Sequence, residues 1–379
     1  MTKHIKTVLV FFGTRPEALK MEPVISALKK QESISVKVCN TGQHYELLNS
    51  VLKEFEIEVD YTLAAMRPGQ SLNVLTSKLI LSCDEVITGL KPDLVLVHGD
   101  TCTTFAASFA AFQAGVPIAH IEAGLRTHNL KSPWPEEANR KLTSVIADWH
   151  FAPTSRAREN LIDEGIPEDT IFITGNTIID MLFKQLDNIN KDHVLREDVA
   201  AIAGFNLQEE EFVLITGHRR ENFGNGFKNI CEAIKSLSKK FPSTYFVFPV
   251  HLNPNVRQQV EQTLSNLANV KLIEPVNYHH FLYLMNCCKL ILTDSGGIQE
   301  EAPSLNKPVI IMRDTTERPE IVTSGAGILA GSDEGKIVEY TSTLLTDTER
   351  YDEMSHVSNP FGDGTAADKI ADIIVAKIR

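Results

Sequence analysis

Short hydrophobic runs recur along the whole chain and alternate with longer segments of helical spacing. Within each run nearly every residue is apolar, rather than every second one. The first half contains TVLVFF, VKVCN, DLVLVHG, PIAHIE and HFAP, and the second half contains FVLITG, YFVFPV, NVKLIE, KLILTD and PVIIM. Runs of this kind are typical of parallel strands whose two faces are both covered by helices. The two series therefore predict an α/β fold with two Rossmann-like, doubly wound parallel-sheet domains.

A polar segment over residues 180–205 separates the two series, because strand-like runs stop there and charge density rises. We predict an N-terminal domain over 1–185 and a C-terminal domain over 186–363. The final segment, 364–379, has apolar residues at helical spacing, and we expect it to form a helix that rejoins the first domain. A chain of 379 residues is long enough for two domains of ordinary size.

Composition excludes several classes of protein. A net charge of −12 argues against a general binder of nucleic acid or anionic membrane, although a local basic pocket stays possible. The first apolar run, Val8 to Gly13, is too short for a signal peptide or a membrane span. The six cysteines show no metal-ligand or CxxC spacing, and no GxGxxG fingerprint is present. We expect a cytoplasmic protein with reduced thiols and without a metal or other cofactor.

Charged residues follow the runs of the first half, at the strand ends where open parallel sheets bind ligands. They are Arg15, Lys20, Asp100, Glu122 and Arg126, with Glu136 and Arg140 four residues apart on the next predicted helix. Singly, each has a structural explanation: Arg15 on a surface loop, Asp100 as N-cap of a helix starting near Thr101, Glu136 as a first-turn carboxylate. Together, three carboxylates and two arginines at one sheet edge predict an acid/base site.

The stretch TDSGGIQEEAP, residues 293–303, combines two opposite preferences. A helix that starts at 295–297 after a strand favours an anion, whereas Glu300 and Glu301 would repel one. A nucleoside diphosphate satisfies both, because its phosphates can bind 295–297 while its neutral ribose diol donates to Glu301. After another strand, His218 and the arginine that follows it could neutralise phosphate or transfer a proton.

Eight segments resemble, in order and over almost the whole chain, the motif series of the non-hydrolysing bacterial UDP-N-acetylglucosamine 2-epimerases. They are FGTRPEALK, VHGDT, IEAGLRT, PWPEEANR, TGHRREN, PVHLNPNVR, TDSGGIQEEAP and RDTTERPE. The resemblance implies two Rossmann-like domains of the GT-B type facing across a cleft, usually in a homodimer. It implies an isomerase that interconverts UDP-GlcNAc and UDP-ManNAc and supplies ManNAc units for cell-surface polysaccharides.

The resemblance also implies roles for individual residues. The implied catalytic residues are Asp100, Glu122, Glu136, Arg140 and His218. The implied substrate-binding residues are Arg15, Lys20, Val276, Phe281, Ser295, Gly296, Gly297, Glu301 and Arg318. A second UDP-GlcNAc, bound as an allosteric activator, is implied at Gln43, His44, Gln70, Arg219 and His251. Many relatives have Gln where this chain has Val276, so here only a backbone contact to uracil is expected.

The chemistry can be reasoned beside the resemblance. The hydrogen on C2 of the sugar has no adjacent carbonyl, so it becomes removable only after the anomeric C–O bond opens and UDP departs. Elimination to 2-acetamidoglucal and re-addition of a proton on the other face would invert C2. A GT-B glycosyltransferase, a hydrolysing epimerase and a non-catalytic UDP-sugar sensor are the alternatives. The carboxylates at 100, 122 and 136 favour the epimerase.

Overall fold

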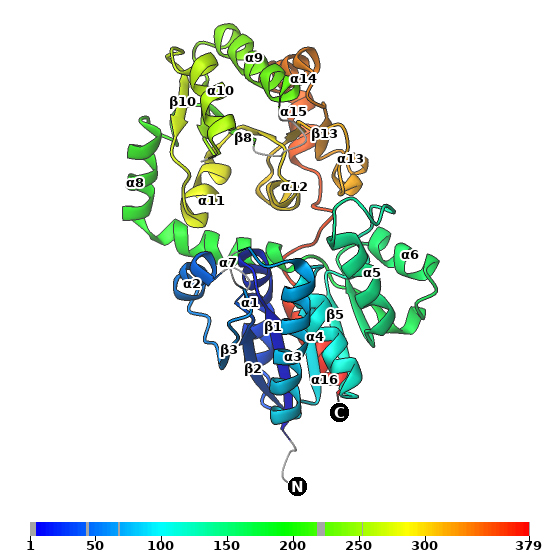
Figure 1. Cartoon of the computed structure of the whole chain (residues 1–379). Helices are drawn as coiled ribbons and strands as arrows, with labels where there is room; N and C mark the ends of the chain where they lie inside the picture. Colours follow the sequence, from blue (N-terminus) through cyan, green and yellow to red (C-terminus); the bar gives the residue numbers. More distant parts are fainter. Residues whose placement is uncertain (1–4, 43–44, 67–68, 218–223, 252, 379) are drawn as a thin grey trace. The chain divides into compact units, whose positions relative to one another are not determined.

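The computed structural model describes residues 5–42, 45–66, 69–217, 224–251 and 253–378. The chain forms two compact units, one of Met1–Met181 with Phe361–Arg379 and one of Leu182–Pro360. Each unit is a parallel sheet covered by helices (Figure 1). In the part of the chain described, none of the helices is both long enough and apolar enough to pass through a membrane.

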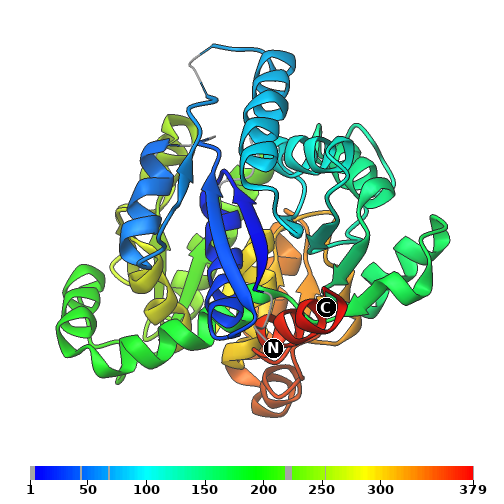
Figure 2. The same ribbon diagram turned by 90° about the horizontal axis from the view of Figure 1, so that it is seen from below.

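Unit 1 contains a seven-stranded sheet in the order β3-β2-β1-β4-β5-β6-β7. Its strands are β1 (Lys6–Phe12), β2 (Ile34–Asn40), β3 (Tyr61–Thr62), β4 (Leu94–His98), β5 (Ile118–Ile121), β6 (Trp149–Ala152) and β7 (Ile171–Ile173). Its helices are α1 (Arg15–Lys29), α2 (Tyr45–Glu54), α3 (Leu72–Leu90), α4 (Cys102–Gln113), α5 (Glu136–Ile146), α6 (Ser155–Asp163), η1 (Glu168–Thr170), the start of α7 (Thr177–Lys191) and α16 (Ala366–Lys377). Figure 2 shows α3 on one side of this sheet and α16 on the other.

Unit 2 contains a six-stranded sheet in the order β10-β9-β8-β11-β12-β13. Its strands are β8 (Phe212–Thr216), β9 (Tyr245–Pro249), β10 (Val270–Ile273), β11 (Leu290–Thr293), β12 (Val309–Ile311) and β13 (Gly327–Leu329). Its helices, after the end of α7, are α8 (His193–Ala203), α9 (Asn225–Lys240), α10 (Pro254–Leu264), α11 (Tyr278–Cys287), α12 (Gly296–Glu301), η3 (Ala302–Leu305), α13 (Pro319–Thr323), α14 (Glu334–Thr346) and α15 (Thr348–Ser355).

The apolar runs form strands because both faces of each sheet are packed. Every residue of β4 and of β8 is buried. In unit 1, Val95 and Val97 of β4 belong to one buried cluster with Ala107 and Ala111 of α4. In unit 2, α9, α10 and α14 contribute to a single buried cluster with the strands. Complete burial of one such aliphatic side chain stabilises the fold by about 1.5–3 kcal/mol.

The prediction of two Rossmann-like parallel-sheet domains is confirmed, and each of the ten predicted runs contains a strand. Three strands were missed: β3, β7 and β13. All three lie at a sheet edge and are only two or three residues long. A strand of two or three residues is too short to give an apolar run that stands out, whereas the edge strand β10, with four residues, was predicted.

In both sheets the strand order reverses at one point, and open parallel sheets bind ligands at the carboxyl ends of the strands beside such a point. In unit 1 the order reverses between β1 and β4, and in unit 2 between β8 and β11. The segments that leave these strands carry the predicted residues near 15 and 100 in unit 1 and near 295 in unit 2.

The last helix, α16, belongs to unit 1 and packs against α1. Asp180 of α7 accepts the backbone N–H of Ala367, at the start of α16, over 2.8 Å. The first N–H groups of a helix have no partner within the helix. The side chain of the N-cap residue, Thr365, accepts none of them, and Asp180 takes that role for Ala367. Burial raises the pKa of Asp180 to about 6. The C-terminal segment is therefore tied to the first sheet by packing and by a side-chain cap.

Candidate functional site

The end of β1 is organised by a buried carboxylate that was not predicted. Glu17, only 2% exposed, accepts the backbone N–H groups of Gly13 and Thr14 over 3.0 and 2.8 Å. Its other oxygen accepts the hydroxyl of Thr101, the N-cap of α4, over 2.6 Å. Burial raises the pKa of Glu17, and the hydrogen bonds that it accepts lower the pKa by a smaller amount. The T-x-x-E spacing of Thr14 and Glu17, a capping-box pattern, was the available signal.

Glu122 follows β5 and lies among three polar neighbours from other elements. It forms an ion pair with Lys20 of α1, and both side chains are about 11% exposed. Its Oε2 also accepts Nδ2 of Asn176 over 3.2 Å, and Nε2 of His98 lies 3.8 Å away. Glu122 has a left-handed backbone, with φ of 59°, an unusual conformation for a residue with a Cβ. Lys20, predicted to bind the nucleotide, is therefore placed against a predicted catalytic carboxylate.

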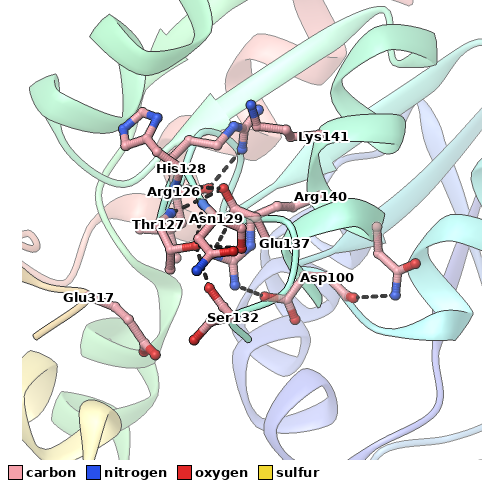
Figure 3. A network of polar contacts seen from close by, with 12 residues as sticks. Asp100, Arg126, Thr127, His128, Asn129, Ser132, Glu137, Arg140, Lys141 and Glu317 are labelled. Atoms are coloured by element: carbon pink, nitrogen blue, oxygen red, sulfur yellow. Dashed lines mark hydrogen bonds and ion pairs between the residues drawn. The ribbon is translucent and has the colours of Figure 1, made fainter. Parts of the chain in front are cut away.

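Asp100 follows β4 and forms an ion pair with Nη2 of Arg140 on α5 (Figure 3). Its backbone carbonyl accepts Nδ2 of Asn139 over 2.9 Å. The alternative explanation of Asp100 as a helix N-cap is wrong, since Thr101 is the N-cap of α4. A Cβ added at Gly99 would lie 3.7 Å from Oε1 of Glu122, so the two carboxylate-bearing loops are neighbours.

Glu136 is the first residue of α5, one turn before Arg140. Glu136 is partly buried. The pKa of the Cys102 thiol, at the start of α4, is raised first by burial of the thiol and then by the negative charge of Glu136. The loops that carry Asp100 and Glu122 and the start of α5 thus meet at the carboxyl edge of one sheet.

Arg126 does not join this group, although it was counted with Arg140 among the arginines near the carboxylates. Its guanidinium is buried and pairs with Glu164, with the shortest contact at 2.7 Å. It also donates to Ser144 over 3.0 Å. Arg126 therefore fastens α5 to α6. The carboxylate that Arg140 holds in addition to Asp100 is Glu137, at 3.1 Å.

Buried His120 supports the same sheet edge and was not predicted to be functional. Nε2 of His120, on β5, lies 2.7 Å from the carbonyl oxygen of Gly99. Since that carbonyl can only accept, Nε2 carries the hydrogen. Burial lowers the pKa of His120 to about 3 and that of His150 on β6 to about 4. Neutral His120 therefore anchors the turn that presents Asp100.

In unit 2 the predicted helix start is confirmed: Ser295 is the N-cap of α12, which begins at Gly296. The Arg318 guanidinium lies directly against this start, because a Cβ added at Gly296 would clash with Nη1 of Arg318. Nε of Arg318 donates to Glu300 over 2.6 Å, and Glu300 is almost completely buried. Glu300, for which no role was predicted, thus balances a cation beside the predicted phosphate site.

Glu301, predicted to bind ribose, accepts the hydroxyl of Tyr278 over 2.8 Å. Tyr278 is the first residue of α11 and is buried; it was not predicted. Val276 precedes the N-cap of that helix, and Phe281 lies in its first turn; both are partly buried.

The remaining predicted residues are placed separately or not at all. Arg15 is the first residue of α1 and is partly buried. Gln70 donates to the carbonyl of Ala65 over 3.2 Å, and the exposed His251 accepts the N–H of Asn253 over 3.1 Å. The other four predicted residues lie outside the described residues: Gln43, His44, His218 and Arg219. Among the described residues, no three His, Cys, Asp or Glu side chains are grouped as metal ligands, so no metal centre is assigned.

A family model for UDP-N-acetylglucosamine 2-epimerase matches residues 26–375. The chain belongs to this family. Among its relatives, the UDP-N-acetylglucosamine 2-epimerase of Escherichia coli K12 is 50% identical over 367 residues, which cover 97% of this chain and 98% of that protein.

Solved structures of other 2-epimerases agree with the fold. The UDP-GlcNAc 2-epimerase of Neisseria meningitidis, solved bound to UDP-GlcNAc, is 51% identical with a TM-score of 0.90, covering 98% of this chain and 100% of that one. The enzyme of Methanocaldococcus jannaschii, solved with UDP-GlcNAc and UDP, is 34% identical with a TM-score of 0.81, covering 98% and 99%.

We predict that His120 makes the stability of this 2-epimerase family member depend on pH. Because its pKa is about 3 in the fold and near 6.5 when unfolded, its contribution is complete above pH 6.5 and is lost as pH falls toward 3. From pH 7.5 to pH 5 this single group should lower the free energy of unfolding by about 2 kcal/mol. Urea unfolding of wild type and His120→Gln at both pH values measures it.

Glutamine can still donate to the Gly99 carbonyl but does not titrate, so the variant should lose less stability on acidification. His128→Asn, at an exposed position on a neighbouring loop, serves as control and should keep the wild-type pH dependence. An identical loss in His120→Gln and wild type would contradict the assignment.

Proposed function

We propose that this chain is a non-hydrolysing UDP-GlcNAc 2-epimerase, an isomerase that interconverts UDP-GlcNAc and UDP-ManNAc. The observation that supports this most is that the loops of Asp100 and Glu122 meet the start of α5, which carries Glu136, in a chain 51% identical to an enzyme solved with UDP-GlcNAc. The product would supply ManNAc units for cell-surface polysaccharides.

The proposed reaction starts with cleavage of the anomeric C–O bond, whose electron pair leaves with UDP. A carboxylate then takes the C2 proton, and the C–H electrons form the C1–C2 double bond of 2-acetamidoglucal. An acid on the opposite face returns a proton to C2, and the phosphate oxygen of UDP adds back to C1. Removal and return on opposite faces require at least two acid/base groups.

Unit 1 supplies those groups in this proposal. Asp100, Glu122 and Glu136 remove and return the proton, and Arg140 orients Asp100. His218, from the residue range of unit 2, is proposed to assist the departing diphosphate. The contacts of Lys20 and Arg140 support this, since each cation holds a carboxylate in place by a charge-assisted contact.

Unit 2 supplies most of the nucleotide-binding residues in this proposal, and Arg15 is proposed as a further one. The helix start at Ser295, Gly296 and Gly297 takes the diphosphate together with Arg318, and Glu301 takes the ribose. The uracil contacts the Val276 backbone and Phe281. The position of the Arg318 guanidinium against Gly296 supports a phosphate there, because cation and helix start favour the same anion.

We propose further that UDP-GlcNAc also binds as an activator, at Gln43, His44, Gln70, Arg219 and His251. The segments TGQHYE and RPGQS support this by their resemblance to the family pattern. This second site is independent of the acid/base assignment.

We also propose a homodimer. Neighbouring helices α3, α4 and α5 expose large apolar side chains: Leu81 (66% exposed), Phe112 (57%), Leu142 (50%) and Val145 (76%). Exposed apolar side chains gathered on adjacent elements are typical of an interface.

We place the protein in the cytoplasm. All six cysteines are free and five are buried, which fits a reducing compartment.

The proposed function predicts the products of one assay. Incubated with UDP-GlcNAc alone in deuterated water, the enzyme should form UDP-ManNAc, and both recovered sugars should carry deuterium at C2. Proton NMR follows both changes. Free ManNAc together with UDP would indicate a hydrolysing epimerase. Reaction only after an acceptor is added would indicate a glycosyltransferase, and binding without any turnover would indicate a sensor.

The acid/base assignment predicts a slower enzyme when one carboxylate is replaced. Glu122→Gln should slow turnover by roughly 100-fold or more in the same assay.

The activator proposal predicts a dependence on trace UDP-GlcNAc. Initial rates from pure UDP-ManNAc should rise when a small amount of UDP-GlcNAc is added, because the second site would then be filled. Equal initial rates with and without it would remove the proposal and leave the epimerase assignment intact.

The dimer proposal predicts that a charge on α5 separates the chains. Size-exclusion chromatography with light scattering should give the mass of two chains for wild type and of one chain for Val145→Asp. Val194→Asp, at an equally exposed apolar position on α8 (77%), should remain dimeric. A wild-type monomer, or a dimer that survives Val145→Asp unchanged, would refute this interface.

A further inference from the structure

Glu137 is a completely buried carboxylate next to the proposed catalytic site, with 0% of its surface exposed. It is the second residue of α5. Its Oε1 accepts the backbone N–H groups of Thr127 and His128 over 3.1 and 3.0 Å. Its Oε2 accepts Nη1 of Arg140 over 3.1 Å. A buried carboxylate is costly unless each oxygen is satisfied, and here the two oxygens serve different partners.

Arg140 is shared between two carboxylates of unequal exposure (Figure 3). Nη1 contacts buried Glu137, whereas Nη2 contacts Asp100, whose side chain is 26% exposed. A guanidinium is planar and holds its donors in a rigid fork, so fixing one nitrogen fixes the direction of the other. The position of the Asp100 carboxylate therefore depends on Glu137 through the guanidinium.

We propose that Glu137 is a positioning residue for the reaction: by holding Arg140 it fixes where Asp100 meets the sugar. This inference rests on the proposed epimerase function. Glu137 itself does not contact substrate in this proposal. Its bond to Arg140 sets the rate of the chemical step, whereas its bonds to Thr127 and His128 shape the loop after β5.

A purely structural role would assign Glu137 to the loop alone. The loop contains His128 with φ of 60°, a left-handed conformation that the two accepted N–H groups stabilise. The division of labour between the two oxygens allows the roles to be separated. In Glu137→Gln, the amide oxygen can keep both backbone N–H bonds, while the amide NH2 opposes Nη1 of Arg140, donor against donor.

The expected result is a loss in kcat without a loss in binding. Glu137→Gln should lower kcat by about 10- to 100-fold, the scale of a misplaced catalytic group, with KM within about twofold of wild type. Thr127→Val is the matched control. It removes the Thr127 hydroxyl, which donates to the Ser132 carbonyl over 2.6 Å and accepts the Asn129 N–H over 3.3 Å, but leaves all Glu137 contacts. Its kcat should therefore stay within about threefold of wild type.

Coupling to Asp100 is the decisive measurement. If Glu137 acts through Arg140 and Asp100, Glu137→Gln should have no further effect on the C2 deuterium exchange rate in an Asp100→Asn background. An equal fold loss in both backgrounds would overturn the proposal, because Glu137 would then act independently of Asp100. An equal loss of kcat in Thr127→Val would also overturn it in favour of the loop.

A second variant keeps the test valid if Glu137→Gln does not fold, which circular dichroism would reveal. Arg140→Lys retains the charge but lacks the rigid planar fork that fixes the direction from Glu137 to Asp100, so it should reproduce the loss in kcat with little change in KM. Wild-type kcat in a folded Glu137→Gln, or in Arg140→Lys, would refute the inference alone. Absence of epimerisation by wild type would instead refute the proposed function.

Discussion

The parallel direction of every strand is the constraint on which the rest of the structure depends. Because all strands of a unit run the same way, their carboxyl ends lie on the same side of the unit. The chain must return to the other side, usually through a helix, before each new strand begins. Residues far apart in sequence, such as Lys20 and Glu122, are thereby brought into contact. The reversal of strand order beside β1 and β8 then opens the place where a ligand can bind.

At the carboxyl ends of the strands, charged side chains hold one another in place, and they differ in how deeply they are buried. Glu17, Glu137 and Glu300 are almost completely buried and hold backbone N–H groups or guanidinium groups. Asp100 is more exposed, yet it is held through Arg140 by one of those buried carboxylates. The buried acids therefore hold backbone and guanidinium groups in place, and through Arg140 one of them also fixes the more exposed Asp100.

Loop geometry adds a second layer of support. Glu122 adopts a left-handed backbone, and the turn at Gly99 is anchored by neutral His120. Burial keeps that imidazole neutral, because an imidazolium inside the sheet would lose its hydration. The positions of Asp100 and Glu122 thus depend on residues that have no chemical role in the proposed reaction.

The sequence by itself determined the two parallel sheets, the helix start at Ser295 and the polar strand ends, because local apolar runs and turn residues carry that information. It did not reveal β3, β7 or β13, which are the short outermost strands of the two sheets. It also did not show that Arg126 turns to Glu164, that Glu137 holds Arg140, or that Glu300 holds Arg318. For Arg126 and Arg318 the partner depends on distances between elements. For Arg140, which has both Glu136 and Glu137 within one turn of its own helix, it depends on which carboxylate faces inward, and only the tertiary structure decides either question.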